Sequence, residues 1–75
     1  MNFENSFGQR VKNLRLTSKL TQSQLGEAIG LSKQAVNDIE QGRRDTTLSK
    51  LITLADYFDV SLDYLVGRSD DPARH

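Results

Sequence analysis

Several residue types that build functional sites are absent, or nearly so, from this chain of 75 residues. It contains no cysteine, which excludes disulfides and thiolate metal sites. Its only histidine is His75, so multi-histidine metal clusters and most histidine-assisted nucleophilic triads are excluded as well. Its carboxylates are scattered, and it lacks a phosphate-cradling glycine loop. We therefore expect no enzyme, no cofactor and no metal.

Long apolar runs are also missing. No stretch approaches the ~18 apolar residues of a membrane span, and the N-terminus lacks a charged-then-apolar signal pattern. A chain of this length forms one small domain that buries only about 60% of the surface its unfolded form exposes. We expect a cytoplasmic protein with no membrane partner and no evident small-molecule ligand.

The chain also lacks an excess of charge of one sign. Ten Lys and Arg residues balance ten Asp and Glu residues, which at face value argues against a nucleic-acid partner. The charges are unevenly distributed, however. Residues 10–50 carry eight basic and four acidic side chains, a net charge of +4, whereas residues 51–75 carry two and five, a net charge of −3. Such asymmetry is weak evidence for a nucleic-acid face, because most charge clusters are simply solvated.

Apolar residues recur at helical spacing throughout, and no stretch alternates as a half-buried strand would. The pattern predicts five helices, over about 7–17, 22–29, 33–41, 46–58 and 62–66. Their expected N-caps are Ser6, Thr21, Ser32, Asp45 or a neighbouring threonine, and Ser61. Short connections between helices predict an all-α bundle.

The segment over 22–41 is the most informative, because two of these helices are joined there by a turn of three residues, 30–32. Leu25, Ala28 and Ile29 form the expected inner stripe of the first of the two helices. Gly26 lies where the second would press closest, and Gly30 supplies the positive φ for the turn.

This pattern resembles the helix-turn-helix of the phage-repressor type, the Cro/C1 repressor or Xre family. The resemblance extends from about residue 7 to 67 and is carried by GQRVKNLR at 8–15, TQSQLG at 21–26, GLSKQAVNDIEQG at 30–42 and LADYFDVSLDYL at 54–65. It implies a five-helix lambda-repressor-like domain over 1–67, followed by a flexible tail over 68–75. Thr46 departs from the pattern, since many relatives have proline there, which loosens the expected start of the helix over 46–58.

The helix over 33–41 is expected to turn Ala35, Val36 and Ile39 inward and a polar face outward. The resemblance implies that this face reads bases in the major groove. Its candidate readers are Lys33, Gln34, Asn37 and Asp38. Lysine can donate to guanine, glutamine and asparagine can bind adenine through two hydrogen bonds, and aspartate can accept from cytosine or orient a neighbouring side chain.

Phosphate contacts are expected around this face. The resemblance places a phosphate-binding glutamine at Gln22, at the start of the helix over 22–29, where backbone amides attract anions. The further candidates are Ser32, Gln41, Arg43 and Arg44, with Arg10, Lys19 and Lys50 as weaker ones.

The resemblance also implies a structural role for Arg15 and Glu40, a partly buried ion pair between the helices over 7–17 and 33–41. One such module buries only about 600–1,000 Å² on DNA, so we expect a homodimer on a palindromic site of double-stranded DNA. The candidate interface residues are Tyr57, Leu62, Tyr64 and Val66, although we expect Leu62 to close the core instead.

The sequence therefore predicts a DNA-binding transcriptional regulator, most simply a repressor. A restriction–modification controller or an antitoxin with the same DNA chemistry remains an alternative. A protein-interaction module is less consistent, because Gln34, Asn37 and Gln41 are poor docking anchors.

Overall fold

The structure is a computed structural model that describes residues 6–73. It contains five helices, namely α1 (Phe7–Thr17), α2 (Gln22–Ile29), α3 (Lys33–Glu40), α4 (Leu48–Phe58) and α5 (Leu62–Leu65). No strand occurs between residues 6 and 73. The expected all-α fold of five helices is thus confirmed.

Each helix begins at a hydroxyl side chain that accepts a backbone N–H three residues further on. The N-caps are Ser6, Thr21, Ser32, Thr47 and Ser61. The cap of α4 is therefore a threonine, not Asp45. At Thr21 the Gln24 side chain also accepts the N-cap backbone N–H, which completes a capping box.

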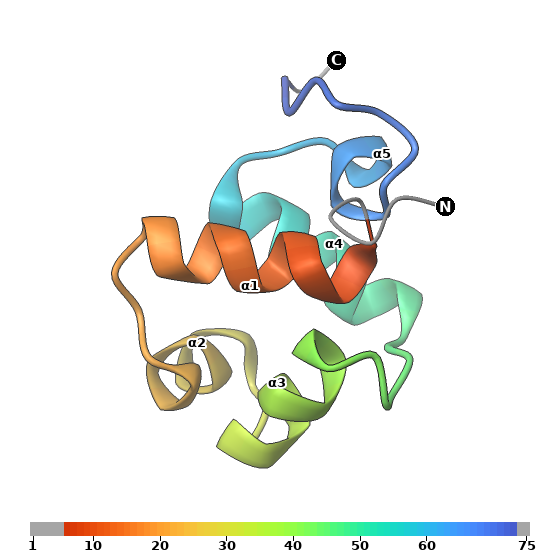
Figure 1. Cartoon of the computed structure of the whole chain (residues 1–75). Helices are drawn as coiled ribbons and strands as arrows, with labels where there is room; N and C mark the ends of the chain where they lie inside the picture. The colour runs from red at the N-terminus through yellow and green to blue at the C-terminus, as the bar shows by residue number, and fades with distance from the viewer. Residues whose placement is uncertain (1–5, 74–75) are drawn as a thin grey trace.

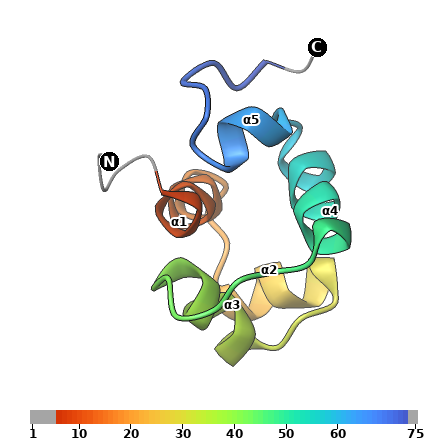
Figure 2. The same cartoon turned by 90° about the vertical axis from the view of Figure 1, so that its right-hand side faces the viewer.

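The helices close into a ring around a small core, and in the view of Figure 1 α1 lies in front of α4. Helix α1 packs against α3 on one side and α5 on the other, while α4 contacts α2 and α5. Figure 2 shows the same ring after a quarter turn, with α2 and α3 at one end and α5 and the C-terminal segment at the other. Leu25, Leu54 and Leu65 are fully buried at its centre.

One expectation about apolar residues is wrong. Ala28 is exposed, so the inner stripe of α2 consists of Leu25 and Ile29. The broad apolar surface of α4 is only partly buried, because Leu48 is 66% and Ile52 44% exposed. The core is too small to take in more than one side of a three-turn helix.

The segment after α5, for which the sequence predicts a flexible tail, lies against the ring as far as it is described. Arg10 of α1 donates to the carbonyl of Ser69 at 3.0 Å and to the Asp70 carboxylate at 2.8 Å. The backbone N–H of Ser61 donates to the carbonyl of Pro72 at 3.0 Å. Residues 69–72 are therefore held at the end of the molecule opposite α3 (Figure 1).

Candidate nucleic-acid interface

The turn between α2 and α3 depends on two glycines. Gly30 adopts φ = 77°, which lets the chain leave α2, and the backbone N–H of Leu31 donates to the carbonyl of Gly26 at 2.8 Å. A Cβ at Gly26 would collide with the carbonyl of Leu31. The constraint on Gly26 therefore comes from the turn itself, and the expectation that α3 presses on it is wrong.

Helix α3 is held to α1 by a second close approach and by an ion pair. A Cβ at Gly8 would lie 2.8 Å from the carbonyl oxygen of Glu40. Arg15 Nε donates to Glu40 Oε2 at 2.6 Å and Arg15 Nη2 to Glu40 Oε1 at 3.1 Å. The two partners are 10% and 0% exposed. Gly8 could not be identified from the sequence, since the backbone carbonyls that it approaches lie about 30 residues away along the chain.

The inner face of α3 consists of Ala35, Val36 and Ile39, all buried. The opposite side presents Lys33 and Gln34, which are exposed, and the half-buried Asn37 and Asp38. Gln34 Nε2 donates to Asp38 Oδ1 at 3.0 Å. Of the roles open to Asp38, the geometry is thus that of an acceptor that orients Gln34.

Gln22 lies at the start of α2 and reaches α3. Its Nε2 donates to Asn37 Oδ1 at 3.0 Å and to Glu40 Oε1 at 3.1 Å. Both amide hydrogens are therefore engaged inside the protein, and the side chain offers only its oxygen outward. For an anion, the available donors at this position are the first backbone N–H groups of α2.

Four candidate phosphate ligands lie at the ends of α3. Ser32 is at its N-terminus, and Gln41, Arg43 and Arg44 follow its C-terminus; all are exposed. Arg43 Nη1 is 3.8 Å from Asp38 Oδ1, a loose surface pair. The arrangement brings two guanidinium groups beside the outward face of α3.

Two weaker candidates have internal roles. Arg10 is buried, and its guanidinium carbon lies 4.2 Å from the centre of the Tyr64 ring in addition to its bonds to the tail. Lys50 Nζ donates to the carbonyl of Ile29 at 2.7 Å, at the C-terminus of α2. The expectation of phosphate contacts by Arg10 and Lys50 is not supported by this geometry, whereas Lys19 is exposed.

Residues 11–65 match the family model described as helix-turn-helix. This chain belongs to the Cro/C1-type helix-turn-helix family. Among its relatives, the uncharacterized HTH-type transcriptional regulator YobD of Bacillus subtilis is 44% identical over 64 residues, 85% of this chain and 57% of that protein. The chain thus spans about half the length of the curated relatives it matches first.

Two solved structures are similar to this helix-turn-helix chain. The P22 c2 repressor in complex with a synthetic operator has a TM-score of 0.80 at 26% identity, covering 85% of this chain and 97% of that one. The restriction-modification controller protein C.AhdI from Aeromonas hydrophila has a TM-score of 0.72 at 34% identity, covering 79% and 89%.

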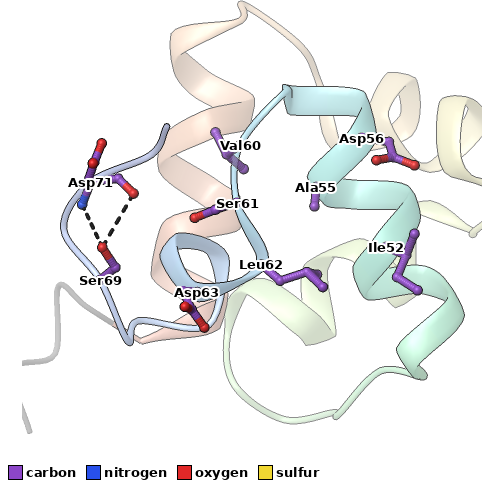
Figure 3. Close-up of a pocket in the computed structure, with 9 residues that line it drawn as sticks. All are labelled: Ile52, Ala55, Asp56, Val60, Ser61, Leu62, Asp63, Ser69 and Asp71. Carbon is purple, nitrogen blue, oxygen red and sulfur yellow. Dashed lines mark hydrogen bonds between the residues drawn. The ribbon is translucent and has the colours of Figure 1, made fainter. Parts of the chain in front are cut away.

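The other end of this helix-turn-helix domain has a different surface. A cleft of about 360 Å³ lies between α4 and α5, with Ile52 and Leu62 on facing sides (Figure 3). Carboxylates of Asp56, Asp63 and Asp71 surround it. The cleft is apolar inside and acidic at its rim, unlike the basic surroundings of α3.

The candidate dimer residues differ in exposure, and the expectation that Leu62 closes the core is wrong. Tyr57, Leu62 and Val66 are exposed, and the Tyr57 ring packs edge-on against Phe58 with centroids 5.1 Å apart. Tyr64 is half-buried and covered by the Arg10 guanidinium. Three of the four candidates are thus accessible to a partner.

Two further features are absent from residues 6–73. No helix there is long and apolar enough to cross a membrane. No group of three or more His, Cys, Asp or Glu side chains is placed to hold a metal ion.

Proposed function

We propose that this chain is a sequence-specific DNA-binding regulator of transcription, most simply a repressor, and not an enzyme. One observation carries the proposal: α3 presents an exposed polar face of Lys33, Gln34 and their neighbours while its other face is locked into the core. A helix that is polar outside and rigidly held is suited to the major groove. The P22 c2 repressor, whose fold is similar, is solved in complex with an operator.

Base reading is assigned to the outward side chains of α3. Lys33 donates to guanine O6 and N7. Gln34 keeps its oxygen and one amide hydrogen for adenine, because only one hydrogen is used by Asp38. A side chain whose rotamer is fixed by a neighbour loses less entropy on binding, so Asp38 supports the contact without touching a base.

Phosphate binding is assigned to the two edges of α3. The backbone N–H groups at the start of α2 and the hydroxyl of Ser32 lie at one edge, and Gln41, Arg43 and Arg44 at the other. These contacts fix the position of the helix in the groove without reading sequence. The exposed cations Lys33, Arg43 and Arg44 on this side are part of the net charge of +4 over residues 10–50.

We further propose that the chain binds as a homodimer to a palindromic operator in the cytoplasm. One domain buries too little surface on DNA for tight binding alone, and half-sites about one helical turn apart match a two-fold dimer. The exposed Tyr57, Leu62 and Val66 support an interface on the α4–α5 side.

Selection of bound DNA from a random pool tests the whole proposal. We expect enrichment of a palindrome whose half-sites are about 10 base pairs apart. Recovery of no preferred sequence, with the protein folded, would overturn the assignment of a sequence-specific regulator. A single unpaired half-site would overturn only the dimer.

A restriction–modification controller is a second candidate, favoured by the similarity to C.AhdI over 89% of that chain. Its DNA contacts would be the same. Mapping the selected operator onto the source genome distinguishes the two, since a controller site lies upstream of genes for a methyltransferase or endonuclease.

A further inference from the structure

The cleft between α4 and α5 has no part in the proposed DNA contacts. It is lined by residues of α4, of α5 and of the segments that flank α5, and by none of α3. We propose that this cleft docks a basic amphipathic segment of another protein, which inserts aliphatic side chains into the cleft and places lysine or arginine at its rim. The inference goes beyond the proposed function and does not depend on it, since α3 takes no part in the docking surface.

The interior of the cleft is apolar and accessible. Ala55 and Val60 are nearly buried, whereas Ile52 and Leu62 are 44% and 40% exposed on facing sides (Figure 3). Exposed aliphatic side chains that face one cleft are stabilised when a partner excludes water from them. The partner therefore needs apolar anchors, and a cleft between two helices suits the aliphatic face of a third helix.

The rim of the cleft determines the charge of the partner. Carboxylates of Asp56, Asp63 and Asp71 line it. Residues 51–73 carry five exposed aspartates against one exposed cation, Arg68. A surface with this excess of negative charge attracts lysine and arginine side chains and repels phosphate groups. The occupant is thus a basic polypeptide, and neither a nucleic acid nor an anionic lipid surface fits.

A second copy of this chain fits the cleft poorly. A two-fold contact brings the same patch of both copies together, so the carboxylates of one rim would face those of the other, which is unfavourable. Of the exposed candidates for the proposed dimer, Tyr57 and Val66 do not line the cleft, and only Leu62 does. The proposed dimer can therefore form without filling the cleft.

One wall of the cleft is formed in advance by the C-terminal segment. Ser69 and Asp71 of this segment line the cleft. The carbonyl of Ser69 accepts from Arg10 at 3.0 Å, and the carbonyl of Pro72 accepts from the backbone N–H of Ser61 at 3.0 Å. A wall that is ordered before binding costs the complex little further entropy. The segment for which the sequence predicts a flexible tail thus belongs to the docking surface.

Selection from a random pool of displayed peptides, each about 14 residues or about four helical turns long, tests the proposal on the full chain. We expect enrichment of peptides that combine lysine or arginine with aliphatic side chains at i and i+4. Fluorescence anisotropy then measures the affinity of the most enriched peptide. Raising the salt concentration from about 0.05 M to about 0.5 M should weaken its binding by about threefold, because the rim charges are screened.

Two substitutions locate the binding at the cleft. Ile52→Ala removes an aliphatic wall and should weaken the enriched peptide by about tenfold, as for a central interface contact. Asp63→Asn removes one rim charge and should weaken it by about threefold at low salt and by less at high salt. The matched controls are Leu16→Ala and Asp45→Asn, since both residues are exposed and neither lines the cleft. Both controls should leave the affinity unchanged.

Three results would overturn the proposal. They are enrichment of no peptide, enrichment of acidic peptides, and undiminished binding of the enriched peptide to folded Ile52→Ala. Circular dichroism checks folding; if Ile52→Ala does not fold, Asp63→Asn decides. Sedimentation of Ile52→Ala adds a fourth, because loss of a dimer without any selected peptide would assign the cleft to self-association. A failure of the proposed function is recognised separately, in the selection from random DNA.

Discussion

The two ends of this molecule each contain a buried arginine, and the arginines differ in what they hold. At the α3 end, Arg15 binds Glu40, whose side chain is 0% exposed. At the α5 end, Arg10 binds Asp70, whose side chain is 87% exposed. The first pair joins two helices inside the core, and the second fastens a terminal segment to the surface. The two ion pairs should therefore contribute differently to the free energy of unfolding, depending on how exposed the acidic side chain is.

The two ends also differ in the chemistry of their exposed side chains. Around α3 the exposed groups are amides and cations fixed by neighbours, such as Gln34 on Asp38. Around the α4–α5 cleft they are apolar side chains bordered by carboxylates. The net charge of zero thus combines exposed cations beside α3 with carboxylates around the α4–α5 cleft.

The largest expected effect follows from breaking the buried pair. Glu40→Ala should lower the free energy of unfolding by about 3–5 kcal/mol, because the Arg15 guanidinium is left buried without its counter-charge. Urea denaturation followed by circular dichroism measures the loss. The double variant Arg15→Met, Glu40→Leu is the control and should be less destabilised than Glu40→Ala. Equal stability of Glu40→Ala and the unchanged chain would contradict the structural role of the pair.

Much of the α3 end could be predicted from sequence because its signals are local. Caps such as Thr21 and Ser32 act within three residues, and Gly30 acts within one turn. The chain of bonds from Glu40 through Gln22 could not be predicted, since it depends on the crossing of α2 over α3. Glutamine side chains at the start of a helix only hint at a hydrogen bond to a neighbouring helix.

The α5 end was predicted less well for the opposite reason. The contact between Arg10 and Asp70 joins residues 60 positions apart, and neither residue has an unusual neighbourhood in the sequence. The exposure of Ile52 could not be predicted either, because hydrophobic periodicity marks an apolar face without saying what covers it.

A smaller loss of stability is expected from Gly8→Ala. The added methyl group would press on the carbonyls of Ile39 and Glu40, both backbone atoms of α3, and would separate α1 from α3. We expect a cost of about 1–3 kcal/mol, as for overpacked cores, with weakened DNA binding. Gly42→Ala is a useful comparison, because it meets no atom within 4 Å and is strained only by φ = 74°. If both variants bind DNA equally well, the packing of α1 does not position α3.

Gln34 and Arg43 both lie beside the Asp38 carboxylate. Substituting each in turn distinguishes a base contact from a phosphate contact. Gln34→Ala should weaken binding to the selected site by about 1–3 kcal/mol and relax the preference at one base pair. Arg43→Ala should weaken binding to all sequences and reduce the slope of log K against log salt by about 1. Titrations at several salt concentrations measure both. Equal losses for Gln34→Ala on selected and random DNA would remove it from the base readers.

The smallest effect is expected at the exposed pair. Asp70→Asn removes a charge that is mostly in water, so it should cost no more than about 1 kcal/mol, and less at high salt. Arg10→Ala should cost more than Asp70→Asn, because it also removes buried methylene groups and the contact with the Tyr64 ring. Urea denaturation at two salt concentrations compares them. A loss for Asp70→Asn as large as that for Glu40→Ala would mean that the tail is part of the core, and the contrast between the two arginines would then be wrong.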